Sequence, residues 1–187
     1  NIMVIGAETI SRIIDIYDRN CMIFSDGAGA TIFSAAEEGS KGGVLSQVSR
    51  TDADAELDYL AMGPSYNPAA QDGNLYIKML GRKIYEYALL TVAGSIKVAM
   101  DKANVGLMDV HKILIHQANE KMDEAILKKL FKLYGEQRDM DEIMPMTIQT
   151  LGNSSVATVP TMLDLILENK LDGHKIENKT VLNMVSR

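Results

Sequence analysis

The stretch KILIHQANEK, residues 112–121, joins two kinds of sequence pattern at a single histidine. Its opening KILI is typical of a buried β-strand, and the charged, amphipathic run that starts at Gln117 is typical of a helix. His116 ends the strand and directly precedes the helix. The carboxyl ends of strands in α/β sheets are where ligand-facing groups collect, so His116 is a candidate functional residue. A core or surface histidine without a function would fit the same position.

Strand and helix patterns alternate on both sides of this junction, which predicts an α/β fold. Strand patterns occur at residues 2–5, 21–24, 30–34, 112–115 and 180–184. Helix patterns occur at residues 81–104, 117–134 and 155–171. Residues 37–74 carry scattered glycines, prolines and acids, so we expect a surface excursion there.

The composition is that of an ordinary globular protein, with 47% hydrophobic and 24% charged residues among 187. The formal net charge of -6 argues against binding nucleic acid or an anionic membrane through bulk charge. A single cysteine, Cys21, excludes an internal disulfide and a thiolate metal cluster, and it fits the reducing cytoplasm. The apolar pattern around Cys21 predicts a small buried hydrophobe rather than a nucleophile.

Both ends of the sequence lie within strand patterns. NIMVIGAET starts inside a buried-strand pattern without a methionine, and KTVLNMVSR stops inside another. We therefore expect the chain to be part of a longer architecture.

Two glycine-containing segments are candidate sites. SDGAGATIF, residues 25–33, lacks the Gly-Lys-Ser/Thr of a phosphate loop and does not open a helix, so close packing of small residues is the favoured interpretation. In TLGNSSVATVP, residues 150–160, Gly152 permits an unusual backbone angle and Asn153 offers an amide donor beside small residues. That layout suits a side chain aimed into a cleft, although an asparagine at such a position is more commonly a helix cap. His111 and His174 are expected to be solvated.

Three segments in this order resemble the carboxy-terminal half of β-ketoacyl-[acyl-carrier-protein] synthase III, a condensing enzyme of the thiolase-like superfamily. They are IFSDGAGATIF, ILIHQANEKMDEAILKKL and LGNSSVATVP. The resemblance covers nearly the whole chain and implies a thiolase-like layered α/β fold with helices sandwiched between mixed sheets. It implies that residues 1–75 are the end of the amino-terminal half and residues 76–187 most of the carboxy-terminal half.

The resemblance also assigns roles to residues. His116 and Asn153 match two members of the family's catalytic Cys-His-Asn set. MLGRKIYEYA, residues 79–88, is similar to the segment that lines the acyl and pantetheine tunnel, which implies tunnel positions for Gly81, Tyr85, Ala88 and Asn119. Tyr85 also fits plain core packing.

The sequence departs from the family pattern at three places. The nucleophilic cysteine belongs upstream of Asn1, and Cys21 does not replace it. The family's glycine-rich loop should follow the TVLNMV strand. The segment YGEQRDMDEIM between His116 and Asn153 looks longer than usual. The 187-residue chain alone is therefore expected to be inactive.

The implied reaction condenses an acyl-CoA primer with malonyl-[acyl carrier protein] to give 3-oxoacyl-[acyl carrier protein], which initiates type II fatty-acid synthesis. Loss of carbon dioxide leaves negative charge on the thioester oxygen, which His116 Nε2–H and the Asn153 amide would stabilise. No cofactor is implied beyond the coenzyme A or phosphopantetheine of the substrates. A homodimer is implied for the full-length enzyme.

The helix pattern after HQAN has one basic face and one apolar face. The basic face carries Lys121, Lys128 and Lys132, with Lys129 beside it. The expected buried face carries Met122, Ile126, Leu130 and Leu133. The basic face could be an ordinary solvated surface or could dock an acidic acyl carrier protein. Other carrier-binding candidates are Gln117, Ala118, Asn119 and Glu120.

Two alternative functions fit the same residues. A related condensing enzyme of secondary metabolism, making a polyketide or quinolone, would share His116 and Asn153. A non-catalytic binding or scaffold piece would lack the nucleophile altogether.

Overall fold

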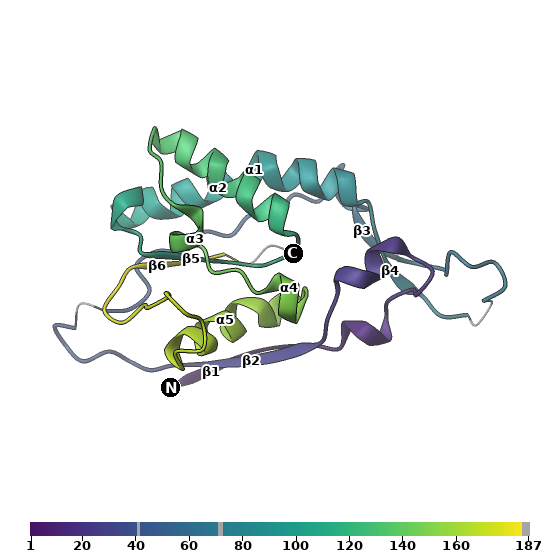
Figure 1. Ribbon diagram of the computed structural model, residues 1–187, viewed down its shortest axis with the longest axis horizontal. Helices are drawn as coiled ribbons and strands as arrows, with labels where there is room; N and C mark the ends of the chain where they lie inside the picture. The colour runs from purple at the N-terminus through teal and green to yellow at the C-terminus, as the bar shows by residue number, and fades with distance from the viewer. Residues whose placement is uncertain (41, 71–72, 185–187) are drawn as a thin grey trace.

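The computed structural model describes residues 1–40, 42–70 and 73–184, and its elements lie in layers (Figure 1). Helices α1 (Gly81–Ala103) and α2 (Glu120–Tyr134) cover the parallel pair β5 (Lys112–Ile115) and β6 (Val181–Met184). Helix α5 (Thr158–Leu167) lies between that pair and the antiparallel ribbon of β1 (Ile2–Glu8) and β2 (Gly27–Phe33). A helix is thus sandwiched between two kinds of sheet, as the layered fold requires.

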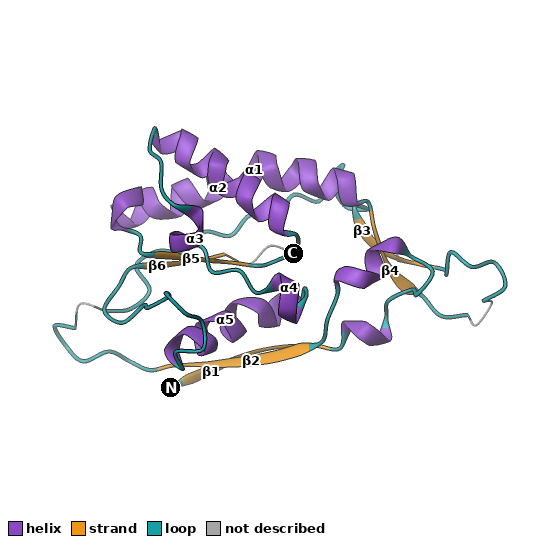
Figure 2. Ribbon diagram, in the orientation of Figure 1, coloured by secondary structure: helices purple, strands orange, loops and turns teal. Residues whose placement is uncertain are grey.

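Shorter elements connect these layers. The hairpin of β3 (Leu60–Gly63) and β4 (Tyr76–Met79) lies on the right-hand side of the molecule in Figure 2. The sequence did not predict it, because each strand is only four residues long and β3 lies within the glycine- and proline-rich excursion. The remaining short helices are η1 (Ile10–Arg12), η2 (Arg19–Ile23), η3 (Leu107–Asp109), α3 (Met140–Ile143), α4 (Ile148–Leu151) and η4 (Ser155–Ala157).

The KILI strand is the centre of the core. Its four residues are buried, and Ile113, Leu114 and Ile115 have no exposed surface. Buried residues of α1 and α2, such as Ile96 and Leu130, form one cluster with Ile113 and Ile115. Each fully buried aliphatic side chain of this kind contributes roughly 1.5–3 kcal/mol. The apolar KILI strand that precedes His116 in sequence is therefore also the centre of the hydrophobic core.

Several elements differ from those expected, among them β1 and β2, which are longer than their strand patterns at residues 2–5 and 30–34. The strand pattern at residues 21–24 was wrong, because η2 occupies most of it and Asp18 accepts a hydrogen bond from the backbone of Asn20 at the start of that helix. Helix α2 starts three residues later than Gln117, where the Asn119 side chain accepts a bond from Met122 N. The helix expected over residues 155–171 is divided into η4 and α5, and it ends at Leu167.

Two burial predictions were also wrong. The apolar residues at the start of β1 are more than half exposed. Successive side chains of a strand point to opposite faces, so neither face of this end of the ribbon is covered by the described residues. Leu133 is 45% exposed near the end of α2, whereas Met122, Ile126 and Leu130 are buried as expected.

The glycines of β1 and β2 allow the ribbon to approach the segment that carries Asn153. A Cβ atom at Gly27 would lie 2.9 Å from Ser154 Cβ, and one at Gly29 would lie 2.6 Å from Pro160 Cγ. At Gly6 a Cβ would lie 2.9 Å from the carbonyl oxygen of Val156. Real Cβ atoms do not approach neighbours this closely. The packing interpretation of SDGAGATIF is therefore confirmed: its glycines allow the ribbon to pack closely against η4 and α5.

Candidate active site

His116 lies at the carboxyl end of β5, where its backbone continues the sheet. Its N–H donates to the carbonyl of Met184 at 2.8 Å, and its side chain is buried, with 7% of the residue exposed. Ring atom Nδ1 lies 3.1 Å from the carbonyl oxygen of Ser155. A carbonyl oxygen only accepts hydrogen bonds, so Nδ1 must carry the proton in this contact. In the neutral ring Nε2 then holds a lone pair.

The protonation of His116 follows from its surroundings. Burial lowers the pKa of the imidazole, and the bond to Ser155 opposes that shift only in part. The ring is therefore neutral at pH 7. Donation from Nε2, the role suggested by the resemblance, requires either a protonated ring or release of the Ser155 contact.

Asn153 is held by backbone bonds to the segment that follows η2. Its N–H donates to Ile23 O at 2.8 Å, and its carbonyl accepts from Ser25 N at 2.9 Å. Gly152 makes this approach possible, because it has φ 69° and a Cβ there would lie 3.1 Å from Ser25 Cβ. The turn around Asn153 is thus fixed by a segment more than a hundred residues away in sequence.

The side chain of Asn153 bonds to the first residue of the short helix that follows. The residue before α5 is Ala157 and the residue before η4 is Ser154, and neither makes a side-chain capping bond. Asn153 Oδ1 instead accepts from Ser155 N at 2.9 Å, and the residue is only 5% exposed. Within the described part of the chain its NH₂ group has no acceptor. Its NH₂ group is thus left to donate, while the Oδ1 bond to the first residue of η4 keeps the helix-cap alternative open.

Both candidate side chains therefore meet at Ser155. The His116 ring donates to its carbonyl oxygen, and the Asn153 amide oxygen accepts from its N–H. The sequence had identified Ser155 only as one of several small residues, and no pattern pointed to this role. Two hydrogen-bonding groups, His116 Nε2 and Asn153 Nδ2, are left without a bond among the described residues.

The residues next to His116 have different surroundings. Gln117 is fully buried, where its Nε2 donates to Pro145 O at 2.8 Å and its Oε1 accepts from Thr147 N at 2.7 Å. That side chain links β5 to the segment before α4 and does not reach the surface. Ala118 is half-buried, while Asn119 and Glu120 are exposed at the start of α2.

The basic face of α2, made by Lys121, Lys128 and Lys132, is exposed as expected. Lys128 pairs with Glu124 one turn earlier, at 3.2 Å. Lys129 does not belong to this face, because its Nζ donates to Leu89 O on α1 at 2.6 Å.

The expected tunnel residues all lie on α1 or at the start of α2. Gly81 is the first residue of α1, and Tyr85 is 37% exposed one turn later. Ala88 is buried in the core cluster shared with α2. Their contact with an acyl chain stays a prediction.

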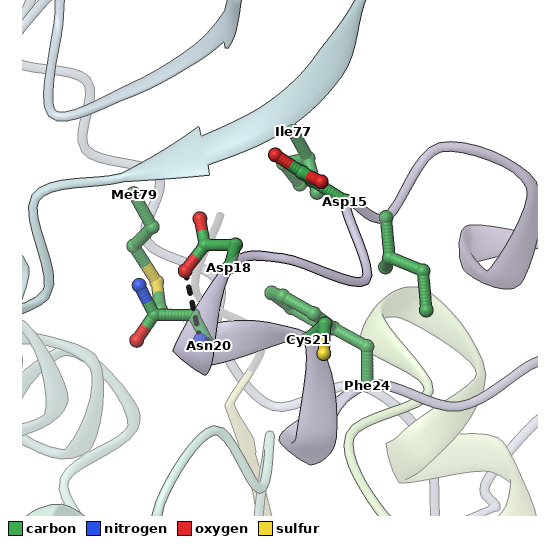
Figure 3. Close-up of a pocket in the computed structure, with 8 residues that line it drawn as sticks. Asp15, Asp18, Asn20, Cys21, Phe24, Ile77 and Met79 are labelled. Carbon is green, nitrogen blue, oxygen red and sulfur yellow. Dashed lines mark hydrogen bonds between the residues drawn. The ribbon is translucent and has the colours of Figure 1, made fainter. Parts of the chain in front are cut away.

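Cys21 lines a small hollow between η2 and β4, which neither His116 nor Asn153 lines (Figure 3). Asp15, Asp18, Ile77 and Met79 line this hollow with it. The thiol is half-buried, with Ile16 O at 4.0 Å from Sγ, so the expectation of a buried strand position was wrong.

The hairpin is anchored beside this hollow by a charge cluster that the sequence did not reveal. Asp15 accepts from Lys78 Nζ at 2.5 Å and from Tyr66 N at 2.6 Å. Burial opposes its charge, but these donors hold the pKa of Asp15 well below its usual value. The described residues contain no group of three or more His, Cys, Asp or Glu side chains that could hold a metal ion. No helix among them is both long and apolar enough to cross a bilayer.

Comparison with known proteins identifies the family of the chain. The family model for 3-oxoacyl-[acyl-carrier-protein] synthase III matches residues 1–53, and the model for the carboxy-terminal part of the same enzyme matches residues 100–182. The β-ketoacyl-[acyl-carrier-protein] synthase III of Erythrobacter litoralis is 34% identical over 165 residues, which are 87% of this chain and 48% of the relative. The Streptococcus gordonii enzyme of the same name is 34% identical over 179 residues, 91% of this chain and 52% of the relative.

A solved structure shows the same fold. The β-ketoacyl-[acyl-carrier-protein] synthase III of Thermus thermophilus superposes with a TM-score of 0.75 at 26% identity, covering 97% of this chain and 53% of that one. The thiolase-like α/β fold is therefore confirmed. The chain spans about half the length of the curated relatives it matches. Two models of one family match successive parts of it, and together with these relatives they show that the chain belongs to the 3-oxoacyl-[acyl-carrier-protein] synthase III family.

Proposed function

We propose that this chain supplies His116 and Asn153 to a condensing enzyme that joins an acyl-CoA primer to malonyl-[acyl carrier protein]. The product is 3-oxoacyl-[acyl carrier protein], the starting compound of type II fatty-acid synthesis. The observation that carries the proposal is the convergence of the two side chains on Ser155, with one hydrogen-bonding group of each left free. The names of the relatives support the choice of substrates.

The first half-reaction moves the primer onto a cysteine thiolate. We place that cysteine upstream of Asn1, as the family resemblance implies. The free Nε2 lone pair of neutral His116 can accept the thiol proton, which leaves a thiolate and an imidazolium. The thiolate then attacks the acyl-CoA carbonyl, the C–S bond to coenzyme A breaks, and the leaving thiolate takes a proton from solvent, so that His116 keeps its Nε2 proton.

The second half-reaction forms the new carbon–carbon bond. The C–CO₂ bond of the malonyl thioester breaks, carbon dioxide leaves, and the electron pair forms an enolate on the thioester. The Asn153 NH₂ donates to the enolate oxygen, and a second bond comes from His116 when Nε2 carries a proton. The carbanion attacks the acyl-cysteine, and the thiolate is released. No bound cofactor is needed for either step.

The partner would be an acidic acyl carrier protein that docks on the basic face of α2. The exposed Lys121, Lys128 and Lys132 support this proposal, since α2 begins four residues after His116. We further propose a cytoplasmic homodimer for the full-length enzyme, on the basis of the family alone.

The experiment is a condensation assay with the full-length enzyme that contains this chain. Incubation with an acyl-CoA and malonyl-[acyl carrier protein] should give a carrier-bound product that is longer by two carbons, detected by intact-protein mass spectrometry. A longer polyketide or a quinolone product would instead support the enzyme of secondary metabolism. Absence of both acylation and product would support the non-catalytic piece and refute the proposal.

A further inference from the structure

Ser155 has a backbone conformation that its neighbours must hold in place. Its φ is 51°, in the left-handed region that serine seldom adopts. Residues in such conformations persist where the surrounding structure fixes them. The His116 ring and the Asn153 amide both bond to this same backbone, so their orientations depend on whatever holds Ser155.

The contact that holds Ser155 comes from the opposite end of the chain. Ser155 Oγ donates to Glu8 Oε1 at 3.2 Å, and the two residues are 147 positions apart. Glu8 is the last residue of β1 and is partly buried. It is the hydrogen-bond partner of the Ser155 side chain among the described residues.

Strand β1 also supports the next residue directly. A Cβ atom at Gly6 would lie 2.9 Å from the carbonyl oxygen of Val156, so the strand backbone lies against that peptide. β1 and η4 are in contact along this line. The strand thus supports the Ser155 turn through a close backbone contact as well as through the Glu8 carboxylate.

We infer that Glu8 is a positioning residue for the site: through Ser155 Oγ it fixes the Ser155 backbone, and thereby the tautomer of His116 and the direction of the Asn153 amide. With the Ser155 carbonyl facing the ring, the neutral imidazole carries its proton on Nδ1. With the Ser155 N–H bound to Oδ1, the NH₂ of Asn153 is the group left to donate. The inference deepens the proposed function, on which the catalytic roles of His116 and Asn153 rest.

The test reads the tautomer of His116 by NMR of the protein labelled with ¹⁵N-histidine, at a pH where the ring is neutral. Loss of one ring signal in His116→Gln identifies the resonance. The wild type should show a protonated Nδ1 and an unprotonated Nε2. In Glu8→Ala the Ser155 carbonyl should no longer be held against the His116 ring. The population should then shift towards the Nε2–H tautomer, which is the one that free histidine prefers.

Matched variants separate the hydrogen bond from general damage. Glu8→Gln keeps a carbonyl oxygen in place of the acceptor, so it should retain the wild-type tautomer. Ser155→Ala removes the same bond from the other side and should reproduce the shift of Glu8→Ala. Combining Glu8→Ala with Ser155→Ala should add little. Glu177→Ala, at an exposed glutamate, should leave the spectrum unchanged.

A wild-type tautomer in folded Glu8→Ala would overturn the inference, as would an equal shift in Glu8→Gln. If Glu8→Ala failed to fold, Ser155→Ala would decide the question in the same way. The measurement uses no substrate, so it is independent of the condensation assay. If the tautomer shifted in Glu8→Ala but the wild-type full-length enzyme had no condensation activity, the proposed function would be refuted and the positioning role of Glu8 would stand.

Discussion

At the scale of single residues, the site depends on unusual backbone angles that the surrounding structure maintains. Gly152 has φ 69° and ψ -170°, a region open almost only to glycine, and a Cβ atom there would lie 3.1 Å from Ser25 Cβ, closer than most real contacts. Ser155 has a positive φ without being glycine. These angles direct Asn153 inward, so the first prediction concerns the glycine that precedes it.

Gly152→Ala should lower the free energy of unfolding by about 1–3 kcal/mol, because the new side chain is strained both by the backbone angle and by Ser25. Gly94→Ala is the matched control. Gly94 lies inside α1 with open space around it, so alanine there should raise stability by about 0.5–1 kcal/mol. Urea unfolding of both variants measures the difference. Equal effects at the two positions would contradict the role assigned to Gly152.

Sequence reasoning located His116 and Asn153 but not the residues that hold them. A histidine at a strand end and an asparagine after a glycine are visible as local patterns. The Glu8–Ser155 bond joins residues 147 positions apart and leaves no periodic trace. The tautomer of His116 depends on which backbone atom faces the ring, which the sequence does not encode locally.

At the scale of elements, α2 carries a buried carboxyl group that its amphipathic pattern does not predict. Asp123 is fully buried in the first turns of the helix, and neither carboxyl oxygen has a hydrogen-bond partner among the described residues. Burial, with a smaller effect from Glu120, raises the pKa of Asp123 to about 8. The folded protein therefore holds this proton much more tightly than the unfolded chain does.

The stability of the protein should consequently fall as the pH rises. The contribution of Asp123 is complete below the ordinary carboxyl pKa of about 3.9 and is lost as the pH approaches about 8. Asp123→Asn should remove this dependence, leave stability unchanged below about pH 3.9 and raise the free energy of unfolding progressively between that pH and about pH 8. Asp123→Leu should also raise the free energy of unfolding by about 1–3 kcal/mol, because it removes an unsatisfied buried polar group.

Urea titrations at pH 5, 7 and 9 measure these effects. If the wild type and Asp123→Asn lost stability in parallel over this range, Asp123 would not be the group that titrates.

The basic face of α2 gives a prediction about partners. Reversing Lys121, Lys128 and Lys132 to glutamate in the full-length enzyme should raise KM for malonyl-[acyl carrier protein] and spare the coenzyme A primer, because the face steers an acidic protein. Added salt should shrink the difference. Lys175→Glu, at an exposed lysine outside α2, serves as the control. An equal loss towards both substrates would argue against docking on this face.

Element by element, the segments that bury a continuous apolar face were predicted well, and those fixed by distant contacts or by capping side chains were not. The strand at 112–115 and the helix at 81–104 were placed within one residue, because each buries a continuous apolar face. The strand pattern at 21–24 failed because Asp18 starts a short helix there. The hairpin of β3 and β4 depends on the contact of its Lys78 with the distant Asp15, which no local pattern reveals.

At the scale of the whole molecule, the site is built where two parts of the chain meet. Residues 23–25 hold Asn153 through backbone bonds, Glu8 holds Ser155, and the glycines of β1 and β2 allow the close approach. The α/β class could be predicted from the alternation of strands and helices, and the layered architecture from the family resemblance. The contact between these two parts of the chain could not, because it depends on packing between layers. The central claim is that this contact positions His116 and Asn153 as a pair of hydrogen-bond donors to the same enolate.

The measurement that tests this claim most directly follows the two half-reactions separately in the full-length enzyme. His116→Ala and Asn153→Ala should each slow carbon dioxide release from the malonyl thioester by an amount equivalent to about 2.7–4 kcal/mol, the usual cost of losing one oxyanion donor. Transfer of a radiolabelled primer to the nucleophile should survive at least in part, and the double variant should be little worse than the poorer single one. If Asn153→Ala released carbon dioxide at the wild-type rate, Asn153 would have no part in the chemistry, and the account of a shared donor pair would be wrong.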